Sequence, residues 1–138
     1  MNWFKNIFLK ADFKKADINI NSSKSFNEMY EDIGAFQYEH EGFTISTTDF
    51  VERINWVEIT QINVFKVDLM TTDRIDMEIV YRDKLIVINE ELSGWYQFIL
   101  KTKQVFPSIP EDWDITIIHP AFATNYRTIY KKLTGKVL

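Results

Sequence analysis

The sequence contains no cysteine, and this excludes disulfides, thiolate metal centres and a cysteine nucleophile. Glycine is also scarce, with four in 138 residues. Phosphate-binding loops and dinucleotide fingerprints each need several glycines at fixed spacing, and neither pattern is present, nor is a GxSxG nucleophile motif. These absences favour a non-catalytic protein over an enzyme and predict no catalytic residues and no cofactor.

Long apolar runs are missing as well. No stretch reaches the roughly 18–20 consecutive apolar residues that span a bilayer. The N-terminus lacks a signal-peptide pattern, since Lys10 interrupts its apolar stretch and no small-residue cleavage site follows. A net charge of −4 disfavours nucleic acid as a partner, because phosphate backbones attract basic surfaces. We therefore expect a cytoplasmic protein with no nucleic-acid partner.

The composition is sufficient for a hydrophobic core. Hydrophobic residues make up 46% and aromatic residues 15% of the chain, enough apolar surface for a compact fold. With 138 residues, a single domain 1–138 is expected. Within it, we expect residues 1–34 to form an N-terminal helical extension and residues 35–133 to form the core.

Residues 25–34 carry the signals of a short helix. Ser25 lies three residues before Glu28, the spacing of a capping box, and Gly34 is placed to end the helix. Apolar residues recur between them at the spacing of one helix face: Phe26, Met29, Tyr30 and Ile33.

From residue 35 to residue 91 the apolar period changes to two, which is typical of strands. The clearest alternation is RIDMEIVYR, residues 74–82, followed by a turn at 82–84. The stretch 52–70 is too long for one strand, so a bend or bulge is expected near Thr60-Gln61. Consecutive strands with short turns predict an antiparallel meander.

After residue 93 the helical period returns. Ser93 is predicted to cap a helix over about 94–106, and Pro107 to end it. Residues 114–118 (DITII) are β-branched and predict a strand or extended segment. Helical spacing of apolar residues in 126–133 predicts a short C-terminal helix. Strands followed by a helix across their end predict an α+β architecture.

Several short patterns together resemble small bacterial proteins with a pleckstrin-homology-like fold. The resemblance covers roughly residues 36–130. It implies a bent antiparallel sheet or split barrel capped by the helix at 94–106, and it carries over no functional residue. The patterns are Trp56-Val57-Glu58-Ile59, Lys66, Asp68, the TTDRI turn, Glu90-Glu91, Gly94-Trp95, FPSIPEDW and PAFATNY.

The resemblance implies a fold that mainly binds phosphoinositides, peptides or proteins. Members that bind phosphoinositides usually present a basic cluster in an early strand turn. Here the turns at Thr47-Thr48-Asp49 and Thr71-Thr72-Asp73 are acidic instead. Lipid-headgroup recognition is therefore not expected, and membrane contact is disfavoured.

Isolated titratable residues give little sign of chemistry. His40 lies between two glutamates and is interpreted as a surface residue, while His119 is interpreted as structural. The two histidines lack the spacing of a zinc motif, and no metal site is predicted. Asp76 and Glu78 share a strand face about 7 Å apart and are interpreted as solvated, as are the acidic residues of 111–114.

The aromatic residues suggest where a partner would bind. Trp56 and Trp95 are predicted in the core, whereas Trp3, Phe4 and Trp113 are candidate partner contacts if exposed. On a helical wheel, an apolar arc of about 140° covers the first three turns, although Lys14 falls inside it. That arc consists of Trp3, Phe4, Ile7, Phe8 and Ala11.

Residues 1–15 also carry four lysines against Asp12, a charge of +3. We expect this segment to pack on the sheet or on a second subunit, which would give a homodimer. The leading hypothesis is a non-catalytic protein-interaction or ligand-binding module. The alternative is a toxin-immunity or inhibitor-type protein, because a small acidic domain docks rapidly on a basic partner. An enzyme ranks third and a peripheral membrane protein fourth.

Overall fold

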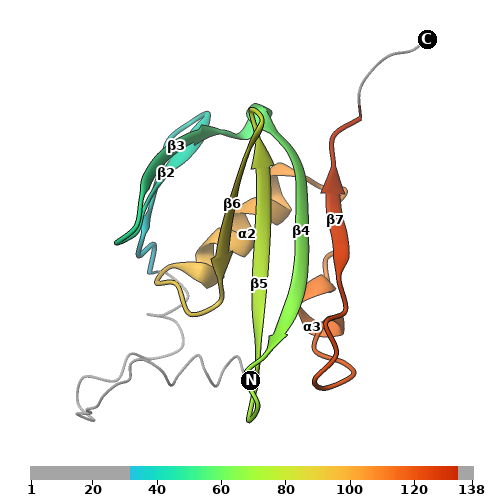
Figure 1. The fold of residues 1–138 in the computed structure, drawn as a ribbon. Coiled ribbons are helices and arrows are strands. Elements are labelled where there is room, and N and C mark those ends of the chain that lie inside the picture. Colours follow the sequence, from blue (N-terminus) through green and yellow to red (C-terminus); the bar gives the residue numbers. More distant parts are fainter. Residues whose placement is uncertain (1–31, 134–138) are drawn as a thin grey trace.

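A computed structural model of the chain describes residues 32–133; residues 1–31 and 134–138 lie outside this description. The predicted N-terminal helices thus fall largely outside it. The described residues form an α+β fold with two antiparallel sheets (Figure 1). The first sheet has the order β1-β2-β3 and the second β6-β5-β4-β7. The strands are β1 (Phe36–Tyr38), β2 (Gly42–Ser46), β3 (Val51–Asn55), β4 (Ile59–Asp68), β5 (Asp73–Tyr81), β6 (Lys84–Asn89) and β7 (Arg127–Lys131).

Three short helical segments complete the described fold: η3 (Trp56–Glu58), α2 (Trp95–Val105) and α3 (Trp113–Thr116). The chain passes from the first sheet to the second through η3, where the backbone N–H of Asn55 donates to Glu58 Oε1 at 3.0 Å. A register shift follows between Ile59 and Gln61. The bulge predicted near Thr60-Gln61 is therefore confirmed, although η3 makes the larger bend.

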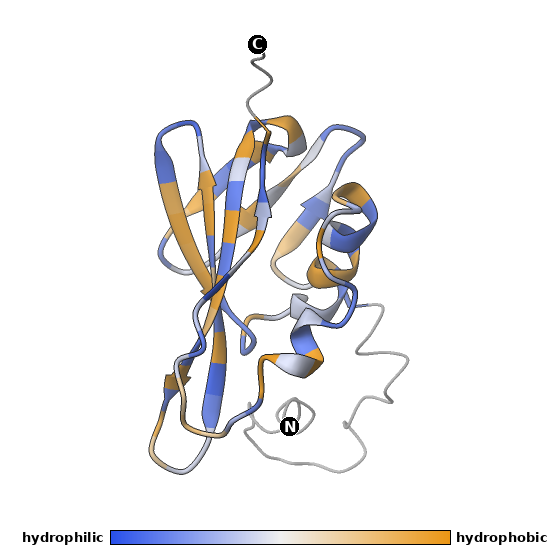
Figure 2. Ribbon diagram, turned by 90° about the vertical axis from the view of Figure 1, so that its right-hand side faces the viewer, coloured by the Kyte–Doolittle hydropathy of each residue, from blue (hydrophilic) through white to orange (hydrophobic). Residues whose placement is uncertain are grey.

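The alternation predicted in β5 is confirmed, because the four residues expected to share one face are all buried. Their neighbours along the chain point to the opposite face, and Figure 2 shows the resulting mixture of hydrophobic and hydrophilic positions along the strands. The turn from β5 to β6 uses Arg82 and Asp83 at positive φ, 48° and 72°, which matches the twist of a tight hairpin. The buried set is Ile75, Met77, Ile79 and Tyr81.

Helix α2 covers the inner side of the four-stranded sheet (Figure 1). The helix predicted over about 94–106 is confirmed, and it buries one face formed by Trp95, Phe98, Ile99 and Thr102. The prediction of Ser93 as its cap is wrong. Gly94 holds that position at φ 92°, because this left-handed conformation suits glycine and a Cβ there would collide with the carbonyl of Ile33.

Two C-terminal predictions are wrong. Within residues 114–118, where an extended segment was expected, the helix α3 forms and buries Trp113 and Ile117, four positions apart on one face. Residues 126–133 contain the strand β7 instead of a helix. β7 pairs with β4 with a register shift between Ile62 and Asn63, and Ile129 is left without an opposed residue. Because of this bulge, the consecutive residues Ile129 and Tyr130 both contact the core, which breaks the strand period of two.

The two sheets do not close into a barrel; within residues 32–133 they remain separate in their hydrogen-bond ladders. Side chains join them at one end instead. Arg82 donates to the carbonyl of Arg53 at 2.7 Å and pairs with Glu58 at 3.2 Å, while Lys84 pairs with Glu52 at 3.0 Å. The described part is therefore one pair of tethered sheets around a shared core.

Candidate binding face of the four-stranded sheet

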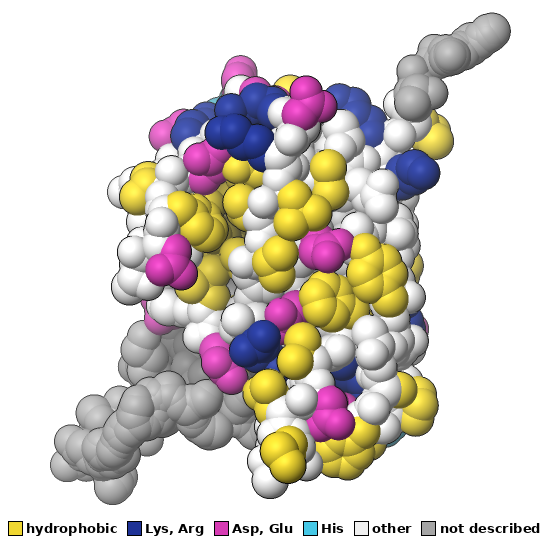
Figure 3. Space-filling view, in the orientation of Figure 1, with side chains coloured by type: hydrophobic (Ala, Val, Ile, Leu, Met, Phe, Trp, Pro, Cys, Tyr) yellow, Lys and Arg dark blue, Asp and Glu magenta, His cyan; other side chains and the backbone are white. Residues whose placement is uncertain are grey.

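The four-stranded sheet has an inner face, which packs on α2, and an outer face, which is turned away from α2. Cross-strand pairs assign side chains to each face, because directly opposed residues in an antiparallel ladder point the same way. Figure 3 shows apolar side chains on the outer face with acidic ones among them. The outer face comprises Gln61, Asn63, Phe65 and Val67 of β4, Arg74, Asp76, Glu78 and Val80 of β5, Leu85, Val87 and Asn89 of β6, Thr128 and Lys131 of β7, and Tyr126 just before β7.

Apolar side chains on this face are open to solvent. Leu85 is 52% exposed, Val87 45% and Tyr126 55%. Phe65 is half-buried and stacks on Tyr126 with ring centroids 5.7 Å apart. Within residues 32–133 no helix covers this surface (Figure 2). Exposed apolar side chains gathered on one sheet face are typical of a protein-binding surface.

A polar network runs through the middle of the patch. Glu78 Oε1 accepts hydrogen bonds from Asn63 Nδ2 at 3.0 Å and from the Tyr126 hydroxyl at 2.7 Å. Asn63 Oδ1 in turn accepts from Gln61 Nε2 at 2.9 Å and from the Thr128 hydroxyl at 2.8 Å. The Glu78 carboxylate is thereby held in one orientation before any ligand arrives.

The network has an electrostatic consequence. The hydrogen bond to Glu78 raises the pKa of the Tyr126 hydroxyl above its ordinary value, because a carboxylate favours the protonated phenol. No Lys or Arg among residues 32–133 pairs with Glu78. Glu78 therefore forms no ion pair within residues 32–133, although Arg74 and Lys131 lie on the same face.

The neighbouring carboxylate behaves differently. Asp76 was expected to be solvated, but it is only 6% exposed, and that expectation is wrong. Arg74 covers it with two hydrogen bonds of 2.7 and 3.0 Å, and the same contact raises the pKa of Arg74. Asp76 and Glu78 thus do not form an acid/base pair, since Asp76 is bound by a guanidinium.

A concave feature lies between the β1–β2 turn and α2. It is a groove of about 400 Å³. The Nζ of Lys101 lies 5.3 Å from the ring centroid of Tyr38, and Glu39 is bound by Arg53 at 2.7 Å. Burial raises the pKa of the Tyr38 hydroxyl, which opposes an acid/base role. Its lining residues are Tyr38, Glu39, His40, Trp56, Lys101, Gln104 and Val105.

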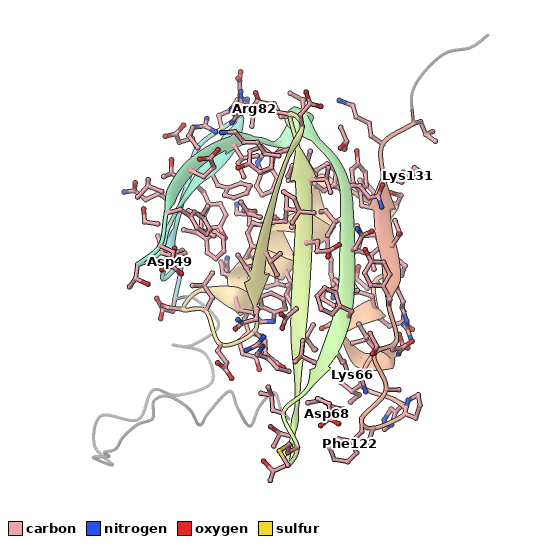
Figure 4. The ribbon with its side chains drawn as sticks, viewed as in Figure 1. Asp49, Lys66, Asp68, Arg82, Phe122 and Lys131 are labelled. Carbon is pink, nitrogen blue, oxygen red and sulfur yellow. The ribbon has the colours of Figure 1, made fainter. Side chains whose placement is uncertain are left out.

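The inner face contains a buried lysine, at the lower end of the sheet in Figure 4. The side chain of Lys66 is 1% exposed and lies 3.2 Å from Asp73 Oδ2. Its ammonium donates to the carbonyls of Ile118 and Pro120 at 2.9 and 2.5 Å, and Asp73 accepts from the N–H of Phe122 at 2.8 Å. All three ammonium N–H groups are engaged, so Lys66 anchors the 118–122 loop and is no free nucleophile.

The predicted site residues are scattered. Trp3 and Phe4 lie outside the described residues. Trp113 is 1% exposed, so its side chain offers no surface to a partner, contrary to the exposure that its candidacy assumed. His40 is exposed and lines the groove. His119 is exposed, and its carbonyl accepts from Asn125 at 3.1 Å.

Sequence reasoning missed the network on the outer face. Asn63 and Glu78, which are hydrogen-bonded, are 15 residues apart in the sequence, and Glu78 and Tyr126 are 48 apart. No local motif joins them. The only available signal was the alternation in β5, which correctly placed Glu78 on the polar side.

Three further findings concern the class of function. Within residues 32–133 no group of three or more histidine or acidic side chains is arranged to hold a metal ion. No helix in that part of the chain has the length and apolarity to cross a membrane. Searches of protein-family models, curated proteins and solved structures give no match to this chain.

Proposed function

We propose that this chain is a non-catalytic, cytoplasmic protein-binding module whose outer sheet face receives a basic partner. The observation that carries the proposal is the Glu78 carboxylate, which is pre-oriented by Asn63 and Tyr126 and lacks a cation among the described residues. Two antiparallel sheets followed by α2 also support a pleckstrin-homology-like fold, a scaffold used mainly for binding.

The chemistry of the face defines the partner. An arginine or lysine of the partner would pair with Glu78, and apolar side chains around it would cover Leu85, Val87 and Phe65. Charge over the whole domain favours the same class, because residues 32–133 contain ten Lys and Arg against sixteen Asp and Glu, a balance of −6. Such a field accelerates association with a basic protein.

The acidic balance also favours the second candidate, a toxin-immunity or inhibitor-type protein. In that case the basic partner is an enzyme or toxin, and the domain blocks it by covering its cationic surface. The two candidates use the same face. They differ in whether the partner loses its activity in the complex, which an assay of the purified partner decides.

Substitutions on the outer face test the proposal. Partners are captured on the wild-type protein in an extract of the source cells, identified by mass spectrometry, purified and titrated calorimetrically against three variants. Val87→Asp and Glu78→Gln are expected to weaken binding by roughly tenfold or more, as at central interface positions. Val57→Asp is the control, because Val57 is 72% exposed but lies on η3.

The control variant is expected to bind as the wild type does. A purified partner whose affinity is unchanged by Val87→Asp and Glu78→Gln would refute the outer face as the binding surface. An acidic partner would refute the proposed charge complementarity.

A further inference from the structure

The outer face combines exposed apolar side chains with Glu78, a carboxylate that forms no ion pair within residues 32–133. The chain itself contains a segment of complementary chemistry. Residues 1–15 carry four lysines and one aspartate, a balance of +3, against −6 on the described residues. Their apolar arc contains Trp3, Phe4, Ile7 and Phe8, and Lys14 falls inside that arc.

This pattern favours the outer face over a membrane as the surface that residues 1–15 bind. A lysine within the apolar arc has no partner in the acyl region of a bilayer, where an interfacial helix keeps its cations on the opposite side. The outer face offers what the bilayer lacks, because Glu78 lies among Phe65, Val80 and Val87. The position of Lys14 therefore favours a protein surface of this composition.

The described chain begins beside the apolar edge of the sheet. The N–H of Ala35 donates to the carbonyl of Ser93 at 2.9 Å, and the carbonyl of Ile33 packs against Gly94. Both contacts lie in the connection that follows β6, the edge strand that exposes Leu85 and Val87. Residues 1–31 consequently join the domain at the edge that carries the patch, and not at the far edge formed by β7.

The connecting chain is long enough to reach the patch. Residues 16–31 span about 24 Å even as continuous helix and about 50 Å when extended. β6, with six residues, is only about 20 Å long. The length of residues 16–31 therefore allows residues 1–15 to contact the outer face of the same molecule.

We propose that residues 1–15 occupy the outer face of the same molecule when no partner is bound, with their apolar arc on Leu85 and Val87 and a lysine at Glu78. The inference rests on the proposed function in one respect, because partner and segment then compete for one surface. Tethering gives the segment an effective concentration in the millimolar range, so an intrinsic Kd of about 0.1 mM leaves roughly one face in ten open.

The absence of cysteine provides a direct test on the full chain. Val87→Cys places a single thiol on the outer face, and Val57→Cys places one on η3 as the control. The rate of labelling by a bulky maleimide is measured for each, with and without Phe4→Asp and Phe8→Asp. These two changes are expected to accelerate labelling of the outer-face thiol, about tenfold for an intrinsic Kd of about 0.1 mM, and to leave the control unchanged.

Each other outcome overturns the inference. Equal labelling rates of the Val87→Cys protein with and without the two phenylalanine substitutions would show that the segment does not cover the face. Protection that grows with protein concentration would assign the cover to a second copy. Protection that appears only with anionic phosphatidylserine vesicles would assign it to a membrane surface.

Failure of this inference is distinguishable from failure of the proposed function. The labelling experiment contains no partner, so its result is independent of partner binding. Conversely, the partner titrations are repeated with the Phe4→Asp, Phe8→Asp variant, which is expected to bind more tightly because the competitor has been removed. An unchanged or weaker affinity would contradict the competition.

Discussion

The two faces of the four-stranded sheet use the same strands for different purposes. On the inner face, Ile62, Val64, Met77 and Ile79 are each 0% exposed, and they pack with α2 in one core. On the outer face, the residues between them form a hydrogen-bond network with exposed apolar neighbours. Burial makes the inner face the main source of stability, whereas the outer face holds pre-oriented groups that contribute less to folding and are available for recognition.

Each face also contains an ion pair, and the two pairs differ in the same way. Lys66 and Asp73 on the inner side have side chains that are 1% and 17% exposed, and the lysine holds a loop. The side chains of Arg74 and Asp76 on the outer side are 25% and 8% exposed, and the arginine covers the aspartate. Loss of a partner should therefore cost more on the inner side, where water cannot replace it.

The largest expected effect concerns aromatic residues. Phe98→Ala removes a ring that stacks on Phe36 at 4.4 Å and meets Phe43 at 5.1 Å. It is expected to lower the free energy of unfolding by about 3–5 kcal/mol, measured by urea denaturation. Phe65→Ala on the outer face should cost about 1 kcal/mol, mainly the stacking on Tyr126. Equal losses would contradict the distinction between the faces.

The ion pairs give the next largest difference. Lys66→Met leaves Asp73 and two loop carbonyls without their donor, and we expect a loss of about 3–5 kcal/mol in the free energy of unfolding. Arg74→Met uncovers Asp76 to water and should cost roughly 1–2 kcal/mol. Thermal and urea unfolding of both variants measure this. A more damaging Arg74→Met would reverse the assignment.

A third prediction concerns the centre of the outer network. Asn63→Ala removes a partner from Glu78, Gln61 and Thr128 at once, and is expected to cost about 1–3 kcal/mol because the site is nearly buried. Gln61→Ala, the control, removes one of these bonds and should cost less. If both variants match the wild type in urea denaturation, the network contributes nothing to folding.

The smallest expected effect depends on pH. Burial, and then the nearby Glu52, raise the pKa of Tyr81 to about 12, whereas an unfolded tyrosine titrates near pH 10. The folded state therefore holds its proton more tightly, so this stability is complete below about pH 10 and is lost as pH rises toward 12. Tyr81→Phe should show a shallower decline between these values in urea denaturation.

Tyr126→Phe is the comparison on the outer face, where the side chain is 55% exposed. Its hydrogen bond to Glu78 shifts the pKa in the same direction, but hydration of the exposed ring makes a smaller change in slope the expected result. An identical pH profile for Tyr81→Phe and the wild type would exclude Tyr81 as the source of the alkaline decline.

Regular patterns within one element were readable from the sequence. The alternation of residues 75–81 and the stripe of residues 95–106 each reflect a boundary between core and solvent, and that boundary repeats with the strand or helix period. Antiparallel order followed from short turns. The start of α2 was misplaced by one residue, because the contact of Gly94 with Ile33 joins distant segments.

Three predictions from the sequence were wrong because contacts with other residues decided the local structure or the burial. Residues 127–131 form β7 because β4 offers a free edge, and the bulge opposite Ile62 and Asn63 breaks the period of two. Asp76 is buried because Arg74 folds over it. Trp113 is buried because the short helix α3 turns it inward. Only the pairing of β7 with β4 joins segments far apart along the chain; Arg74 and Asp76 lie two positions apart on β5, and their contact was overlooked in the sequence.

The sequence by itself determined the fold class, the antiparallel pairing of consecutive strands within each sheet, the face that each residue of β5 occupies and the apolar stripe of α2. These depend on short turns and on the period of side chains along a single element. Only the tertiary structure decided that Glu78 is fixed by Asn63 and Tyr126 within an open apolar surface. That arrangement needs three strands to meet in register, and hydrogen bonds between strands depend on distances in space and not on separation along the chain.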